Sequence, residues 1–139
     1  MPDIYVEVGP MSVSKISTKV PSNYKSKAKE LMHDAAIKAI RGASGFTPDK
    51  IGNPKGFYFD ATLSEIVIGT YRGQPSVTCK VTGVVATYPE KRMLTQSLAG
   101  NTTLAGGTAD SDVRDCITAV MEGTTKDQVI PFLKKQPVP

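Results

Sequence analysis

The sequence predicts an α+β fold, a two-layer sandwich in which a mixed or mostly antiparallel sheet of four or five strands carries two helices on one face. Three observations lead to this prediction. Two segments repeat apolar residues every three or four positions, which is the period of a helix packed on a core. Several others alternate apolar and polar residues, as half-buried strands do. Turn residues separate consecutive alternating segments, which favours antiparallel pairing.

The size of the chain indicates one domain. With 139 residues, 40% hydrophobic and 22% charged, residues 1–139 are expected to form a single globular core. No stretch approaches the ~20 apolar residues that span a bilayer, and the first residues do not match a secretory signal. We therefore expect a cytoplasmic protein or a subunit of a virion or other assembly as the sequence stands, and an envelope protein if a signal has been removed.

The first strand is expected at residues 4–8, where Ile, Val and Val alternate with polar residues. Residues 9–22 have no clean period and predict an extended arm or a weak edge strand. A helix then begins with Ser22 or Asn23 as its N-cap and ends at about Arg41, before a glycine. Its apolar stripe consists of Ala28, Leu31, Met32, Ala35, Ala36, Ala39 and Ile40.

The middle of the chain predicts a long loop and then a meander. Residues 42–56 hold four Gly and two Pro, and loops of this length are often functional. Residues 57–68 alternate with a register shift near Ser64-Glu65, which indicates one long strand with a bulge or two short strands. Further strands are expected at residues 77–86, interrupted by a glycine, and at residues 93–105. The face of this sheet away from the helices is expected to carry Tyr5, Tyr58, Thr62, Thr78, Lys80 and Thr82.

The second helix is expected at residues 110–122, with aspartates at its start where the helix dipole favours them. Its apolar face consists of Val113, Cys116, Ile117, Val120 and Met121. Gly123 is expected to end the helix, and Thr125 with Gln128 resembles a capping box for one last turn. Residues 131–139 contain three prolines and predict an irregular tail.

Charge and motifs exclude several classes of ligand. The net charge of +4 is spread over separate places, without the dense basic stripe and interleaved aromatics of a nucleic-acid groove. The glycine-rich segments match neither a phosphate loop nor a dinucleotide fingerprint. The aspartates at the start of the second helix are accounted for by capping. We expect no cofactor, no metal and no nucleic-acid partner.

Catalysis would depend on one side chain. His33 is the only histidine, so a Ser-His-Asp triad or a multi-histidine metal site would have to use it. It lies off the apolar stripe of the first helix, where a surface position is expected. We therefore predict no catalytic residue, with a small enzyme that uses His33 as the alternative from another class.

The two cysteines are expected in the same layer. Cys79 lies on the apolar phase of a strand and Cys116 on the apolar face of the second helix. In a reducing compartment they would be buried free thiols, and in an oxidising one they could form a disulfide between helix and sheet. Zinc is not expected, since no Cys-x-x-Cys spacing or nearby histidine accompanies them.

The order strand, helix, antiparallel strands, helix resembles the small α+β domains of bacterial envelope lipoproteins, including the penicillin-binding-protein activators and the curli-secretion family. A more local resemblance, to uncharacterised proteins of predatory and social deltaproteobacteria, covers about the last 65 residues. It rests on Cys79, Pro89, Asp115-Cys116 and Ile130-Pro131. These resemblances imply an architecture and a bacterial setting, and they identify no functional residue.

These observations predict a non-catalytic structural or interaction module, an accessory subunit of a bacterial envelope or secretion assembly. The alternative is a repeating structural subunit of a phage virion, injection apparatus or filament. The expected partner is protein, in a homo-oligomer or a larger assembly. Contact is expected through apolar residues that no predicted helix or strand buries, because extended apolar segments can pair with an unpaired sheet edge. They are Val13, Ile16 and Val20 in the arm and Phe132, Leu133 and Val138 in the tail.

Overall fold

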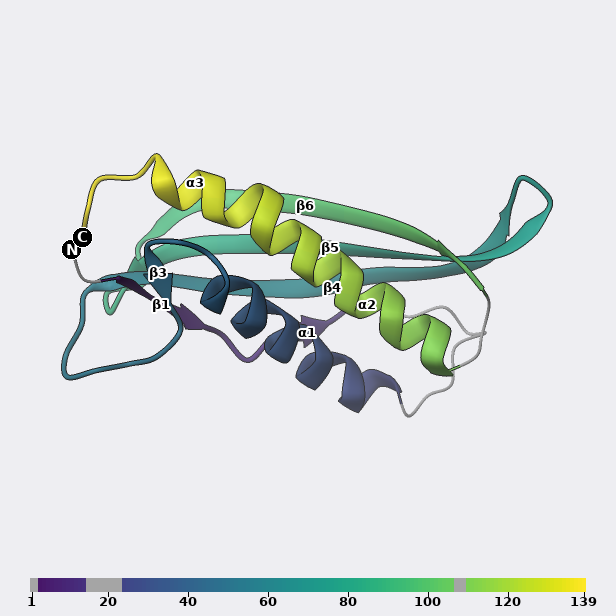
Figure 1. Cartoon of the computed structure of the whole chain (residues 1–139), viewed down its shortest axis with the longest axis horizontal. Coiled ribbons are helices and arrows are strands. Elements are labelled where there is room, and N and C mark those ends of the chain that lie inside the picture. The colour runs from purple at the N-terminus through teal and green to yellow at the C-terminus, as the bar shows by residue number, and fades with distance from the viewer. Residues whose placement is uncertain (1–2, 15–23, 107–109) are drawn as a thin grey trace.

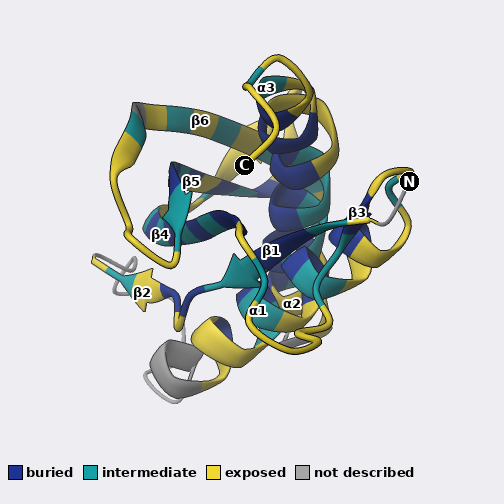
Figure 2. Ribbon diagram, turned by 90° about the vertical axis from the view of Figure 1, so that its left-hand side faces the viewer, coloured by how far each residue is buried: buried dark blue, intermediate teal, exposed yellow. Residues whose placement is uncertain are grey.

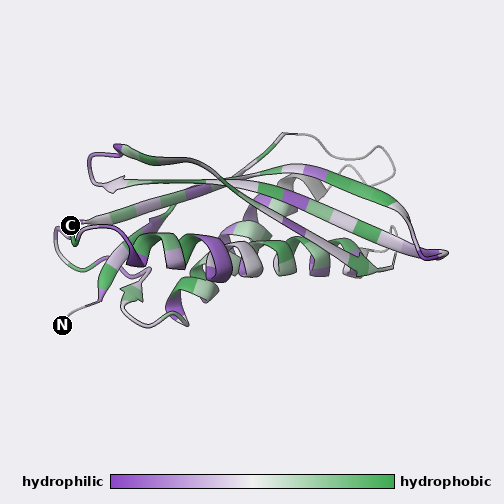
Figure 3. Cartoon of the chain, turned by 90° about the horizontal axis from the view of Figure 1, so that it is seen from above, coloured by the Kyte–Doolittle hydropathy of each residue, from purple (hydrophilic) through white to green (hydrophobic). Residues whose placement is uncertain are grey.

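A computed structural model of the chain describes residues 3–14, 24–106 and 110–139. A sheet forms one layer and the helices form the other (Figure 1). Seen from above, the helices cover one face of the sheet and leave the other face open (Figure 3). The predicted two-layer α+β architecture, with helices on one face, is therefore confirmed.

The sheet is mixed, as one of the two predicted alternatives had it, and has six strands in the described part of the chain, more than the four or five predicted. Their order is β3-β1-β4-β5-β6, with β2 also on β4. The strands are β1 (Ile4–Val8), β2 (Ser12–Val13), β3 (Phe46–Thr47), β4 (Gly56–Tyr71), β5 (Gln74–Tyr88) and β6 (Met93–Ala105). The first three pair in parallel, β1 with both β3 and β4 and β2 with β4, while β4-β5-β6 is an antiparallel meander.

The parallel pairing has a physical reason. Strand β1 reaches β4 through the helix α1 (Tyr24–Arg41), and a strand-helix-strand crossover brings two neighbouring strands side by side in the same direction. Strand β3 lies inside the segment predicted as a loop, and its two residues extend the parallel edge. The prediction of a structureless loop over residues 42–56 was therefore wrong at Phe46–Thr47.

The long hairpin follows the sequence pattern. Strand β4 is continuous, with a register shift between Leu63 and Glu65, so one strand with a bulge is the correct reading. Tyr71 pairs with Gln74 across a two-residue turn. The turn residues Arg72 and Gly73 have φ of 54° and 78°, the left-handed backbone that a tight hairpin turn requires. The hairpin extends well beyond the helices (Figure 1).

The second helix is longer than predicted. It consists of α2 (Asp110–Thr124), the π-helical turn η1 (Thr125–Val129) and α3 (Ile130–Lys134) without a break. The N–H of Ile130 donates to the carbonyl of Thr125, the wider spacing of a π turn. Pro131 then lies in the first turn of α3, where a missing N–H costs little. The predicted end at Gly123 was therefore wrong, and the predicted tail was wrong for residues 131–134, since the chain is irregular only after Lys134.

The core lies between the sheet and the two helices (Figure 2). The predicted stripes of both helices contact it, and all of their residues are buried except Leu31, which is partly buried. Phe59 is fully buried, and a Cβ at Gly83 would lie 2.9 Å from its ring, so glycine at this position makes room for the ring. Strand β5 continues through Gly83, which was expected to interrupt it.

Candidate functional site

The open face of the sheet is a surface that the helices leave uncovered (Figure 3). Successive residues of a strand point to opposite faces, so Phe57, Phe59, Ala61 and Leu63 face the helices and the residues between them face outward. The predicted outward residues Tyr58, Thr62, Thr78, Lys80 and Thr82 are half-buried or exposed. Tyr5 shares this face but is buried, at 7% exposure.

Three tyrosines and two carboxylates gather at one end of this face, and we call them the tyrosine cluster: Tyr5, Glu7, Tyr58, Asp60 and Tyr88. Tyr5 Oη donates to Glu7 Oε1 at 3.2 Å, and Tyr58 Oη donates to Asp60 Oδ2 at 3.2 Å. The members of each pair are two residues apart on one strand, so they share a face. The rings of Tyr5 and Tyr88 meet edge to face, with centroids 5.1 Å apart.

The chain's own lysines cover this cluster. Lys91 Nζ lies 4.6 Å from the ring centre of Tyr58, and Lys50 Nζ lies 5.7 Å from that of Tyr88. Cations over aromatic faces are attracted by the ring quadrupole. Both lysines come from loops that flank the sheet, so the cluster joins those loops to the open face.

The tyrosine cluster also fixes the start of the arm. Asp60 Oδ1 accepts hydrogen bonds from the N–H groups of Met11 and Ala61, both at 2.9 Å. The N–H of Gly9 donates to the carbonyl of Phe59 at 2.7 Å. A Cβ at Gly9 would collide with Tyr58 Oη and the Asp60 side chain, so only glycine fits there. The cluster therefore has a structural role that accounts for each of its carboxylate contacts.

Two tyrosines of the cluster have raised pKa values. Burial, together with the charge of Glu7 and the hydrogen bond to it, raises the pKa of Tyr5 to about 12. Burial and the neighbouring Asp60 raise the pKa of Tyr58 as well. Both phenols are therefore neutral donors near pH 7, and neither is poised to act as a base.

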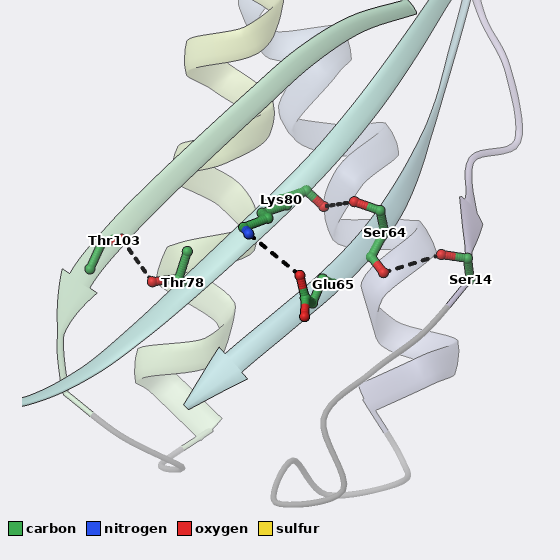
Figure 4. Close-up of polar contacts among 6 residues, drawn as sticks. All are labelled: Ser14, Ser64, Glu65, Thr78, Lys80 and Thr103. Atoms are coloured by element: carbon green, nitrogen blue, oxygen red, sulfur yellow. Dashed lines mark hydrogen bonds and ion pairs between the residues drawn. The ribbon is translucent and has the colours of Figure 1, made fainter. Parts of the chain in front are cut away.

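The other end of the open face carries a chain of polar contacts across the strands (Figure 4). The hydroxyls of Thr78 and Thr103 are 2.7 Å apart, joining β5 to β6. Lys80 Nζ lies 3.5 Å from Glu65 Oε2 on β4. Ser64 Oγ donates to the carbonyl of Lys80 at 3.0 Å. The charges on this part of the face are thus paired toward β4, on the side away from β6.

Two hollows lie at the ends of the sheet. The larger, about 560 Å³, lies where the hairpin meets the end of β6. It is lined by Tyr71, Arg72, Gln74, Pro75, Ser76, Thr103, Leu104 and Ala105. The second, about 460 Å³, is lined by Asp3, Tyr5, Thr47, Asp49, Ile51 and Pro54. Neither lining includes a histidine or a cysteine. Within the described residues no three His, Cys, Asp or Glu side chains gather to hold a metal ion.

His33 lies on the flank of α1, with its side chain 37% exposed. Its Nδ1 is 3.8 Å from Asp34 Oδ1, the carboxylate of its neighbour in sequence. Neither hollow includes His33. The structure thus places the lone histidine away from both hollows.

Cys79 and Cys116 are free thiols, both fully buried in the layer between sheet and helix. The neighbouring Cys116 thiol and burial raise the pKa of Cys79 above its ordinary value. Cys116 Sγ donates to the carbonyls of Val77 and Thr102, at 3.5 and 3.4 Å. The two cysteines are therefore neighbours in the layer between sheet and helix, as the shared-layer prediction requires.

The residues predicted to contact a partner have different environments. Val13 lies in β2 and is partly buried against the core, and Ile16 and Val20 fall outside the described residues. Leu133 is 2% exposed and Phe132 packs partly against the core, both within α3. The prediction that no helix or strand buries them was wrong for this pair, because the helix continues past Pro131. Val138 is 73% exposed.

Sequence reasoning missed a further feature, the free edge of β6. The strand pairs with β5 on one side and ends the sheet on the other. Its 13 residues contain no Asp, Glu, Lys, Arg or Pro. Charges and prolines usually protect an edge strand from pairing with another chain. Their absence from a segment already predicted as a strand could therefore have indicated a free edge.

No family model matches the sequence, and no curated protein sequence matches it. The fold, by contrast, has solved counterparts. Protein XCC0632 from Xanthomonas campestris, described as family-model DUF330, aligns with a TM-score of 0.55 and 12% identity, over 96% of this chain and 87% of that one. A PelC dodecamer from Paraburkholderia phytofirmans aligns with a TM-score of 0.51 and 13% identity, over 89% of this chain and 87% of that one.

A minor lipoprotein from Acinetobacter baumannii is also similar, with a TM-score of 0.44 and 6% identity, over 94% of this chain and 90% of that one. The Xanthomonas and Paraburkholderia proteins, with TM-scores of 0.55 and 0.51, share the fold of this chain. Each alignment covers nearly all of both chains, so the whole domain and not a fragment is shared. In the described part of this chain, no helix is long and apolar enough to cross a membrane. The chain has the fold of these small bacterial α+β proteins.

Proposed function

We propose that the chain is a non-catalytic accessory subunit of a bacterial envelope or secretion assembly, which acts through contacts with other protein chains. The observation that supports this most is the likeness of fold, over nearly the whole chain, to a bacterial protein that is a dodecamer. A domain in an assembly contacts its neighbours through exposed surfaces. In this chain an open sheet face and a free sheet edge are available for such contacts.

The chemistry of the described residues supports a role without catalysis. The lone histidine lies 3.8 Å from the carboxylate of Asp34, its neighbour in sequence. The phenols of Tyr5 and Tyr58 donate to carboxylates within their own strands. The thiols lie in the core, where a substrate would have to displace the helix to reach them. A nucleophile beside an oriented base, the arrangement that covalent catalysis needs, is not assembled by these groups.

The alternative is a repeating structural subunit of a phage virion, injection apparatus or filament. The long uncharged edge of β6 favours repeated copies of one chain over a single foreign partner. The two readings differ in where the protein is found. Fractionation of the host should place an envelope subunit with membranes and a virion subunit in particles that sediment after lysis.

Size-exclusion chromatography with light scattering tests the proposal. We expect a mass of at least twice the 14.8 kDa of one chain, and His33→Ala is expected to leave this mass and the protein's activity in its host unchanged. Loss of host activity in His33→Ala, in a protein that still folds and assembles, would instead support the small-enzyme alternative.

A further inference from the structure

We propose that β6 is a self-association surface, at which two copies of the chain pair their β6 strands antiparallel about a two-fold axis at Asn101. The pairing would join two sheets into one continuous sheet. This inference rests on the proposed function and deepens it, since it names the partner as a second copy and the contact as a strand edge.

The edge is open along its length. Strand order places β6 at the end of the sheet, and within the described residues it pairs with β5 alone. The end of the second helix packs on the core-side face of β6, where Asp127 and Gln128 line a hollow of about 190 Å³ together with Asn101. The row of backbone groups on the outer side of β6 is therefore free to pair with another strand.

The register shows which backbone groups point outward. In an antiparallel pair, residues alternate between those that bond to the partner strand and those that point away from it. The N–H of Gly106 donates to the carbonyl of Pro75, its opposite residue, so by alternation Leu104, Thr102 and Gly100 bond to β5. The N–H and C=O groups of Ala99, Asn101 and Thr103 then point to the free edge. The regular ladder runs from Leu98 to Ala105, and Asn101 lies near its middle.

The composition of the strand permits self-pairing. Like charges directly opposite each other destabilise a strand pair, and a two-fold axis places each residue near a copy of itself or a close neighbour. Strand β6 has 13 residues and contains neither a charged residue, which could repel its copy, nor a proline, which would remove a backbone N–H. The nearest lysine on the open face, Lys80, is held by Glu65 toward β4, so its charge is directed away from the edge. A second copy is therefore the occupant that the charge pattern favours.

Side chains and helices leave room for the pairing. Ala99, Asn101 and Thr103 are small, and the Thr103 hydroxyl is held on the face by Thr78 at 2.7 Å (Figure 4). Helix α2 packs over β5 and β6. Thr124 at the end of α2 lies directly over Gly100 of β6, so the ends of the two α2 helices would pack against each other across the axis. Pairing centred on Asn101 and extending over residues 97–105 would form about ten backbone hydrogen bonds.

Charge substitution at the axis tests the inference. Asn101→Lys and Asn101→Asp each place like charges opposite each other, so each alone should weaken self-association about tenfold or more. An equimolar mixture should regain it, because Lys then faces Asp. Thr82→Lys adds the same charge to the same face on β5 and serves as the matched control. Thr103→Pro removes an N–H that points outward, so it should block association without disturbing the ladder to β5.

Sedimentation velocity of the wild type, the variants and the mixture gives the outcome, with circular dichroism to confirm folding. Dissociation of both single variants, recovery in the mixture and an unaffected control would support the edge. Wild-type association that survives both Asn101→Lys and Thr103→Pro would overturn it while leaving the proposed function intact. Failure of the mixture to recover would overturn the axis at Asn101. A monomeric wild type would overturn self-pairing, and the proposed function would then require a different protein as partner.

Discussion

Truncation of Leu133 to alanine tests whether the C-terminal segment belongs to the core. Leu133 is 2% exposed and lies in α3, beyond both the π turn and Pro131. Truncating a buried leucine costs about 2 to 5 kcal/mol, from lost burial and the cavity left behind. A chain of 139 residues has an unfolding entropy of about 0.3 kcal/mol/K, so the melting temperature should fall by about 7 to 17 °C.

The assay is thermal unfolding followed by circular dichroism, with a urea titration to give the free energy of unfolding. Val138→Ala is the matched control, because Val138 is 73% exposed, and it should change stability by no more than about 0.5 kcal/mol. Equal midpoints for Leu133→Ala and Val138→Ala would refute the reasoning, since they would mean that α3 is not docked and that the tail is free for other contacts.

Three other predictions concern the core, the thiols and the tyrosine cluster. Ile117→Ala should lower the free energy of unfolding by about 2 to 5 kcal/mol, since Ile117 is fully buried; a wild-type urea midpoint would contradict its place in the core. Cys79 and Cys116 should resist iodoacetamide in the native protein and react in urea, as mass spectrometry would show, because both thiols are buried; rapid native labelling would count against this. Since the pKa of Tyr5 is raised to about 12 from 10.0, the folded state keeps this proton while the unfolded state loses it, so its contribution to stability should decline as the pH rises from 10.0 to about 12. Tyr5→Phe should remove the phenol that ionises near pH 12 in an absorbance titration, and an unchanged titration would refute the assignment.

Local patterns predicted those elements whose structure depends on local chemistry. The helix expected to end at about Arg41 is α1, and the register shift near Ser64-Glu65 is the bulge of β4. The predicted second helix ended at Gly123 because glycine and proline usually end helices. In the structure a π turn instead continues the helix to Pro131. Tertiary packing of Val129 and Leu133, both buried, outweighs that local preference.

Strand direction could not be read from alternation, because the period of two is the same in parallel and antiparallel strands. The order strand, helix, strand at the start of the chain did indicate strand direction, because such a crossover favours parallel pairing of the two strands. Strand β3 has two residues, too few for any period to be recognised.

The candidate surface was predicted in part for similar reasons. The outward positions Thr78, Lys80 and Thr82 follow from alternation, which is a local property. The tyrosine cluster joins Tyr5, Tyr58 and Tyr88 from three strands, so it depends on register that only the fold supplies. The free edge required the strand order, although the absence of charge in residues 93–105 was visible from the start.

Residue-resolved hydrogen exchange along β6 tests the account most directly, because it asks whether the free edge is occupied in solution. The amides of Leu104, Thr102 and Gly100 bond to β5 and should be protected in every state of the folded protein. If copies assemble through β6, the amides of Ala99 and Asn101 should be protected equally well at high protein concentration and should lose that protection on dilution. Fast exchange of these outward amides at every concentration would contradict assembly through this edge.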